Sequence, residues 1–218
     1  MTPEITDLSI VLIGDFSPSI IQPYWLAYKK LITESDAQNA RIEMVHKEIT
    51  KFDLDWANLE ITRQRFLIRT LKQDYFEITK DLVVSIFKIL KDTPLSYLGI
   101  NHVFHFKFDP HNFEKISNSL VSFNIWRNII DDPKLLSLQI TENPRKDGLN
   151  GSFNVIINPS ELIQYDGISI NINDHFGITT DNKNTNNKDI VNILTGNWAN
   201  SLDRANKLYT NLWKNLAI

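Results

Sequence analysis

Residues 98–108, LGINHVFHFKF, alternate between apolar and polar side chains more clearly than any other stretch of the chain. Ile100, Phe104 and Phe106 share one parity, whereas His105 and Lys107 fall on the other. Because successive side chains of a β-strand point to opposite faces, this spacing predicts a strand with one buried wall and one wetter wall. The feature that most constrains the chain is therefore a sheet with one dry face.

The first half of the chain alternates predicted strands with predicted helices. Apolar pairs between residues 74 and 91 recur with the helical period of 3.6, and Asp74 is expected to cap that helix. The elements expected here are strands at 8–13, 41–50, 58–62, 65–70 and 98–108, and helices at 23–32 and 74–91. Their order resembles the βαββαβ order of ferredoxin-like domains.

The second half is expected to hold a three-stranded antiparallel meander and a long C-terminal helix. Asp109-Pro110 is typical of a helix start, and a second short helix is predicted over 125–130. From Asp189 onward, apolar residues keep to one face over about 28 residues, which makes a helix about 40 Å long at 1.5 Å per residue. The meander strands are expected near 136–140, 153–157 and 168–172, followed by a mobile polar loop at 181–188.

The whole pattern predicts one α+β domain over residues 1–218, with a largely antiparallel sheet. Both halves, 1–108 and 109–218, mix helices with hairpins, which suggests two pseudo-duplicate halves, although no residue pattern recurs between them. A chain of this size buries about 70% of the surface that its unfolded form exposes, so it needs no cross-link to stay folded.

Composition excludes several classes of protein. A net charge of −3 argues against a protein devoted to nucleic acid, which usually carries a basic excess. The absence of cysteine excludes disulfides, a thiolate nucleophile and cysteine-ligated metals. Residues 1–16 lack the positive start of an export signal, and no run approaches the roughly 20 apolar residues of a membrane span. We expect a cytoplasmic protein with no membrane partner and no cofactor.

The expected end of the third meander strand is the best candidate for a ligand site. Asn171 and Asn173 share its polar face, and the Asp174-His175 pair follows where loops usually carry function. An Asp beside a His can orient a ligand or a base, but no nucleophile-elbow serine accompanies the pair, so a hydrolase triad is unsupported. An Asx turn at a strand end explains the same residues and is the commoner case.

The polar wall opposite the dry face of the meander is nearly uncharged. It consists of Ser137, Gln139, Thr141, Ser152, Asn154, Asn158, Ser169, Asn171 and Asn173. Such a wall is able to hydrogen-bond a sugar, a nucleotide or the backbone of a partner. A solvated face of an antiparallel sheet has the same composition, and we favour that interpretation.

Arg63, Arg65 and Arg69 share one parity around the predicted hairpin, which suits the binding of phosphate or nucleic acid. The nearby carboxylates Glu60, Asp53 and Asp55 are able to pair with them, and we favour that interpretation, because edge strands often carry charge. No metal site is predicted, since His102 and His105 lie an odd number of residues apart in one strand and face opposite sides. His102 is expected in the core with a hydrogen-bond partner.

Four tryptophans, Trp25, Trp126, Trp198 and Trp213, are candidate anchors of a protein interface, because tryptophan is enriched at binding hot spots. Tryptophans are still more often buried in a core than placed at an interface. If Trp198 and Trp213 serve folding alone, the interface prediction for them fails.

The chain resembles a family of uncharacterised small bacterial proteins. The resemblance runs from Arg65 through Leu98-Gly99-Ile100-Asn101 and includes Asp147-Gly148 and Asn173-Asp174-His175-Phe176. It implies a bacterial cytosolic α+β protein and transfers no activity. The 23 asparagines, 21 of them beyond residue 100, are typical of AT-rich coding sequence and fit a bacterial origin.

We therefore expect a non-catalytic assembly or adaptor protein that forms a homo-oligomer or binds a protein partner, in a setting such as bacterial defence or a mobile element. A small-molecule binder or weak hydrolase that uses Asn171, Asn173, Asp174 and His175 is the first alternative. A nucleic-acid accessory protein that uses Arg63, Arg65 and Arg69 is the second.

Overall fold

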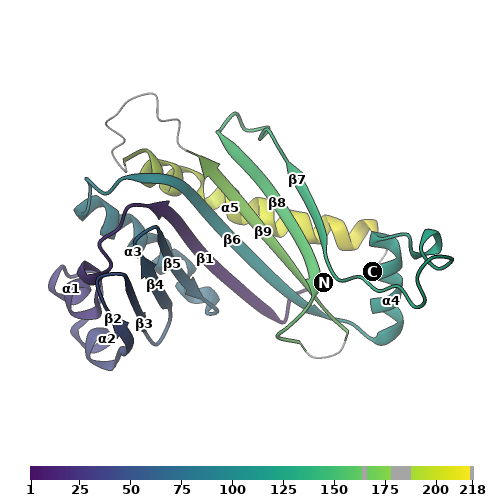
Figure 1. Ribbon diagram of the computed structural model, residues 1–218, viewed down its shortest axis with the longest axis horizontal. Helices are drawn as coiled ribbons and strands as arrows, with labels where there is room; N and C mark the ends of the chain where they lie inside the picture. The colour runs from purple at the N-terminus through teal and green to yellow at the C-terminus, as the bar shows by residue number, and fades with distance from the viewer. Residues whose placement is uncertain (164–165, 178–187, 217–218) are drawn as a thin grey trace.

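A computed structural model of the protein describes residues 1–163, 166–177 and 188–216 (Figure 1). The described strands form one sheet in the order β2-β3-β4-β5-β1-β6-β9-β8-β7, and every neighbouring pair is antiparallel. The predicted α+β class with a largely antiparallel sheet is confirmed. The polar tract predicted as a mobile loop lies, over residues 181–187, outside the described residues.

The sheet is built around its two long central strands, β1 and β6. Leu8, Ile10 and Leu12 of β1 have no exposed surface, and Ile10 lies opposite Ile100 of β6. Residues 98–108, whose apolar and polar side chains alternate most clearly, therefore lie in the middle of the sheet. The strands are β1 Ile5–Gly14, β2 Arg41–Val45, β3 Ile49–Asp53, β4 Asn58–Thr62, β5 Arg65–Thr70, β6 Leu95–Lys107, β7 Leu138–Glu142, β8 Gly151–Pro159 and β9 Gly167–Gly177.

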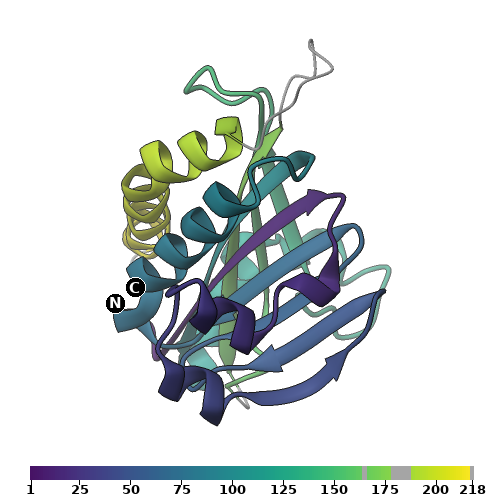
Figure 2. The ribbon, with the colours of Figure 1, turned by 90° about the vertical axis from the view of Figure 1, so that its left-hand side faces the viewer.

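The two longest helices, α3 and α5, lie on the same side of the sheet, as the turned view shows (Figure 2). The helices are α1 Pro23–Tyr28, α2 Glu34–Asn39, α3 Phe76–Ile89, α4 Pro110–Leu120 and α5 Lys188–Asn215, with single 3-10 turns at η1 Pro18–Ile20, η2 Gln73–Tyr75 and η3 Phe123–Ile125. One core cluster joins α3 and the start of α5 to β1, β3, β4 and β5, and a second joins α4 and the end of α5 to β6, β8 and β9. The long C-terminal helix is confirmed. We call the opposite side of the sheet the open face.

The two halves of the sheet follow similar paths on either side of the β1–β6 pair. β1 is followed by helices, the β2 to β5 meander and α3, while β6 is followed by α4, the β7 to β9 meander and α5. β5 and β9 flank the central pair, β4 and β8 come next, and β3 and β7 follow. β6 begins the second set of elements, so the two similar paths meet between α3 and β6.

Several predicted details differ in the structure. Residues 41–50 hold β2, a turn and the start of β3, so four strands separate α2 from α3, where the predicted ranges hold three and a βαββαβ order holds two. Asp74 is not a cap, because η2 precedes α3 and the helix begins at Phe76. The expected helix at 125–130 is reduced to the single turn η3. Asp109 does cap α4, accepting a bond from the Asn112 backbone N–H at 2.9 Å.

The first meander strand has only part of the dry face predicted for it. Leu138 packs against the second core cluster, but Leu136 is 82% exposed and Ile140 is 57% exposed, because β7 is the outermost strand of the described sheet. Among the described residues, no helix combines the length and apolarity that crossing a bilayer requires.

Candidate functional site

The predicted ligand residues separate onto two faces of β9. Asn171, Asn173 and His175 lie on the open face, whereas Asp174 lies on the helix-covered face and is 2% exposed. The strand runs on to Gly177, so the prediction that Asp174 and His175 lie at its end is wrong. Because neighbours in a strand point apart, Asp174 and His175 are unable to act on one ligand from their positions in this strand.

One row of polar side chains crosses the open face through all nine described strands. Pairwise register places its members opposite one another in the order Arg41, Asp53, Asn58, Arg69, Ser9, Asn101, Asn173, Asn154 and Thr141. We call this set the polar row. Side chains directly opposite one another in an antiparallel pair are close enough to interact, so such a row becomes a chain of contacts.

The second half of the polar row is a continuous chain of hydrogen bonds. Thr141 Oγ1 donates to Asn154 Oδ1 at 2.7 Å, and Asn154 Nδ2 donates to Asn173 Oδ1 at 3.1 Å. Asn173 Nδ2 donates to Asn101 Oδ1 at 2.7 Å, and Asn101 Nδ2 donates to Ser9 Oγ at 3.2 Å. Each amide is therefore held in one orientation by its neighbour on the next strand.

Charge divides the open face into two halves. Over β2 to β5, the open face carries ion pairs, such as Arg41–Asp53 at 2.6 Å within the polar row and Lys51–Glu43 beside it. Over β7, β8 and β9, no open-face side chain is an acid, a lysine or an arginine. We call this second half, together with Asn101 of β6, the amide face. Besides His175, its polar residues are Asn101, Gln139, Thr141, Ser152, Asn154, Asn158, Ser169, Asn171 and Asn173. A shallow hollow of about 680 Å³ lies over most of them.

An aromatic pair borders the amide face. The Tyr97 and His175 rings stack with centroids 5.3 Å apart, and Tyr97 is 46% exposed. Burial, and then the nearby Arg145 guanidinium, lower the pKa of His175, so its ring is neutral at pH 7. No carboxylate contacts His175 among the described residues, which leaves it without the partner that a general base uses in a triad.

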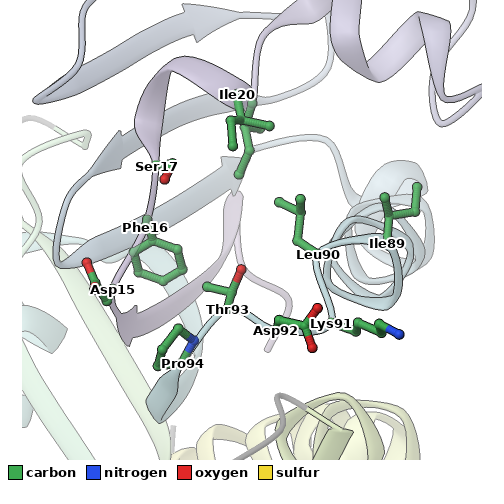
Figure 3. Close-up of a pocket in the computed structure, with 11 residues that line it drawn as sticks. Asp15, Phe16, Ser17, Ile20, Ile89, Leu90, Lys91, Asp92, Thr93 and Pro94 are labelled. Carbon is green, nitrogen blue, oxygen red and sulfur yellow. The ribbon is translucent and has the colours of Figure 1, made fainter.

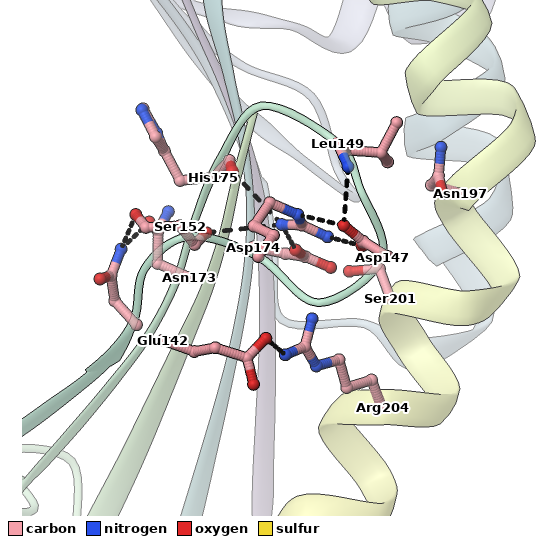
Figure 4. A network of polar contacts seen from close by, with 12 residues as sticks. Glu142, Asp147, Leu149, Ser152, Asn173, Asp174, His175, Asn197, Ser201 and Arg204 are labelled. Carbon is pink, nitrogen blue, oxygen red and sulfur yellow. Dashed lines mark hydrogen bonds and ion pairs between the residues drawn. The ribbon is translucent and has the colours of Figure 1, made fainter. Parts of the chain in front are cut away.

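Asp174 instead serves a buried ion-pair network that sequence analysis missed (Figure 4). Arg145, from the loop between β7 and β8, binds Asp174 and Asp147. Its Nη1 also approaches the backbone oxygens of His175 and Ser152, and its guanidinium lies 4.2 Å from the centre of the Phe176 ring. The hydrogen bond from Arg145 lowers the pKa of Asp147. A lone Arg in a polar loop carries no sequence signal for burial, so only the fold reveals this role.

The three arginines predicted to bind phosphate are each paired with a carboxylate. Arg63 binds Glu48 at 2.7 Å and Arg65 approaches Glu60 at 3.6 Å. Arg69 Nε donates to Asp7 at 2.7 Å. Glu60 is the one partner that the sequence predicted. The carboxylates offset the positive charge that a nucleic-acid backbone needs, so the geometry weakens that alternative.

The tryptophans divide between core and surface. Trp198 is 3% exposed and Trp213 is 1% exposed, so neither lies on the surface of the folded chain as an interface anchor must. The Trp198 indole N–H donates to Glu77 of α3, and Trp213 packs edge-on against Phe106 and Phe108. Trp126, in contrast, is 41% exposed. Helical periodicity places Trp198 and Trp213 on one face of the C-terminal helix. It does not state whether that face is covered by the sheet or by a partner.

The expected core histidine is confirmed. His102 is 1% exposed and its Nε2 lies 3.3 Å from Ser201 Oγ of α5. Burial lowers its pKa to about 4. His105 lies on the opposite face, as its spacing predicted, where it contacts Ser160 at 2.8 Å. No group of three histidines or acids among the described residues is placed to hold a metal ion.

A separate hollow of about 340 Å³ lies between the end of β1 and the turn from α3 to β6 (Figure 3). Phe16, Leu90 and Ile20 make its apolar walls, while Asp15 and Asp92 stand at its edge. The Asp15 backbone N–H donates to the Pro94 carbonyl at 3.0 Å and holds the two sides together. The hollow contains none of the predicted site residues and no histidine.

Searches against protein-family models and against curated proteins found no match to this chain.

Proposed function

We propose that this protein is a non-catalytic binding protein, an adaptor whose amide face binds a partner protein. The observation that carries the proposal is the hydrogen-bonded chain from Thr141 through Asn154 and Asn173 to Asn101. It holds four polar side chains in fixed positions on a face that no described helix covers (Figure 2). Side chains that are already ordered lose little entropy when a partner binds them.

The composition of the amide face favours a macromolecule over a small ligand. Small-molecule sites are concave and mostly apolar, whereas this hollow is shallow and most of the residues that line it carry amides or hydroxyls. The centres of protein interfaces are depleted in charged residues and enriched in tyrosine. Asparagine, serine and an exposed tyrosine are also the residues with which antibody loops bind proteins through adaptable hydrogen bonds. Tyr97 is the aromatic anchor in this proposal.

Within the part of the chain that the structure describes, no acid contacts the His175 ring, which supports a non-catalytic role. His175 stacks on Tyr97, and the neighbouring Asp174 faces the other side of the sheet in a salt bridge with Arg145. We further propose a cytoplasmic location, with which the absence of cysteine is compatible, because a chain without thiols folds in either redox state. The partner that fits this face has a surface without net charge that offers backbone or side-chain amides.

Site-specific photo-crosslinking in the native host tests the proposal. A photoreactive residue at position 171 on the amide face is compared with one at position 60, which lies on the charged half of the open face. We expect one discrete protein adduct from position 171 and none from position 60. Adding Asn173→Lys, which places a charge in the chain of amides, reduces the adduct at least about tenfold. The matched change Ile49→Lys on β3 leaves the adduct intact.

Three outcomes oppose the proposal. One is the absence of any adduct from position 171. Another is an adduct that forms equally from position 60 or that survives Asn173→Lys. The third is an adduct with nucleic acid in place of protein, which favours the alternative accessory role.

A further inference from the structure

The two halves of the sheet match strand for strand except at one edge. β5, β4 and β3 correspond by position to β9, β8 and β7, but β2, which covers the outer edge of β3, has no counterpart beside β7. The residues at the equivalent place in the chain, between η3 and β7, form no strand. The outer edge of β7 therefore lacks a described neighbour where the first half has one.

The two edge strands also differ in how they resist further pairing. β2 carries Arg41 and Glu43 and has an irregular register between Ile42 and Met44. Charged residues and bulges are the devices by which natural edge strands prevent pairing with other chains. β7, with the sequence LQITE, pairs with β8 in unbroken register and contains no bulge, proline, lysine or arginine.

The exposed side chains of β7 and of the residues just before it are apolar on the side of the sheet that carries the long helices. Ile140, at the centre of the strand, is 57% exposed, and Leu136 just before the strand is 82% exposed. The charge of Glu142, at the end of β7, is already paired with Arg204 of α5 at 2.7 Å. An unprotected, regular edge with exposed apolar side chains is the type of edge that accepts another strand.

We propose that β7 pairs antiparallel with β7 of a second copy of this chain, so that the two sheets join into one. The strand is complementary to itself about Ile140. In that register Ile140 faces its own copy and Gln139 faces Thr141 of the second copy. Glu142 faces Leu138 of the second copy, so the two carboxylates are kept apart and like charges are not opposed.

The joined sheet places the amide faces of the two copies side by side, because Gln139 and Thr141 belong both to β7 and to that face. The inference stands apart from the proposed function, since it concerns the strand edge and requires no partner protein. A five-residue strand pair buries little area compared with standard interfaces, so we expect a dimer with a dissociation constant on the order of micromolar.

Sedimentation velocity at ~5 to 200 μM tests the pairing. We expect wild-type protein to move from 25.3 kDa toward twice that mass as its concentration rises. Ile140→Lys raises the dissociation constant at least about tenfold, because a lysine on the edge blocks pairing while its exposed position spares the fold. Ile42→Lys on the β2 edge, where the native side chain is 43% exposed, is the matched control and leaves the dimer unchanged.

A cysteine scan gives a second readout that does not depend on stability. Ile140→Cys becomes the only thiol in the chain and lies opposite itself across the two-fold axis, close enough for a disulfide. We expect a covalent dimer under mild oxidation from Ile140→Cys and not from Ile42→Cys. A wild-type monomer throughout the concentration range, or a dimer that Ile140→Lys leaves intact, overturns the inference. Loss of the photo-crosslink from position 171 with retention of the dimer overturns the proposed function alone.

Discussion

Arg145 and Asp174 form an ion pair whose side chains are only 2% and 3% exposed, and this pair fixes the loop between β7 and β8 against β9. Asp147, which is 38% exposed, binds the same guanidinium from the solvent side. The chain neighbour of Asp174, His175, faces the other side of the sheet. One strand thus contributes a structural acid to the core and a surface histidine to the amide face.

Replacing Asp174 with alanine is expected to destabilise the protein strongly. The change leaves the buried Arg145 with only the partly exposed Asp147, and removing one partner of a buried pair costs about 3 to 5 kcal/mol. Urea unfolding followed by circular dichroism measures the difference. The matched variant Asp147→Ala is expected to cost less, because its carboxylate is near solvent. Equal losses of unfolding free energy in the two variants would show that the burial of Asp174 does not determine how much its ion pair with Arg145 stabilises the fold.

Stability is expected to fall between pH 7 and pH 5 because of His102. Its pKa in the folded state is about 4, below the ordinary value of 6.5, so the unfolded chain binds more protons over that interval. The contribution of neutral His102 to the free energy of unfolding is fully present above pH 6.5 and is lost as the pH falls toward 4. Between pH 7 and pH 5 the loss is about 2 kcal/mol. His102→Gln, measured by urea unfolding at both pH values, is expected to lose that part of the pH dependence. A variant with the wild-type dependence contradicts the prediction.

Trp213 and Trp126 are expected to behave oppositely when truncated. Trp213→Ala removes a ring that is 1% exposed and packs against Phe106 and Phe108, and such a change costs about 3 to 5 kcal/mol. Trp126 is 41% exposed, so Trp126→Ala is expected to cost no more than about 0.5 kcal/mol. Thermal and urea unfolding of the two variants give the comparison. A mild effect at Trp213 would place it outside the core.

The amides of the polar row are expected to be energetically coupled. Asn173→Ala removes one bond to Asn101 and one to Asn154, and Asn101→Ala removes its bonds to Asn173 and Ser9. Each single change is expected to cost about 1 kcal/mol, and the double variant about 0.5 to 1 kcal/mol less than the sum. A double-mutant cycle by urea unfolding measures this coupling. Strict additivity would mean that the two side chains are independent on the open face.

The sequence predicts which side chains of the polar row lie on one face of each strand, but not that they meet across the sheet. Parity along residues 98–108 and 168–173 identifies which side chains share a face, and Asn101 shares the parity of His105 and Lys107. Parity does not state which strands are neighbours. Asn101 and Asn173 are 72 residues apart and meet only because β6 pairs with β9. The polar row as a whole depends on eight strand pairings that no local pattern specifies.

The strand alternation, the long amphipathic helix and the burial of His102 follow from the sequence by itself, because each depends on the period with which one chain segment turns its side chains inward or outward. The strand order, the burial of Arg145 and the exposure of Ile140 were decided only by the tertiary structure. These properties depend on which segments lie side by side and where the helical layer ends. Such contacts join residues distant in the chain, and their free energy is shared among many side chains at once.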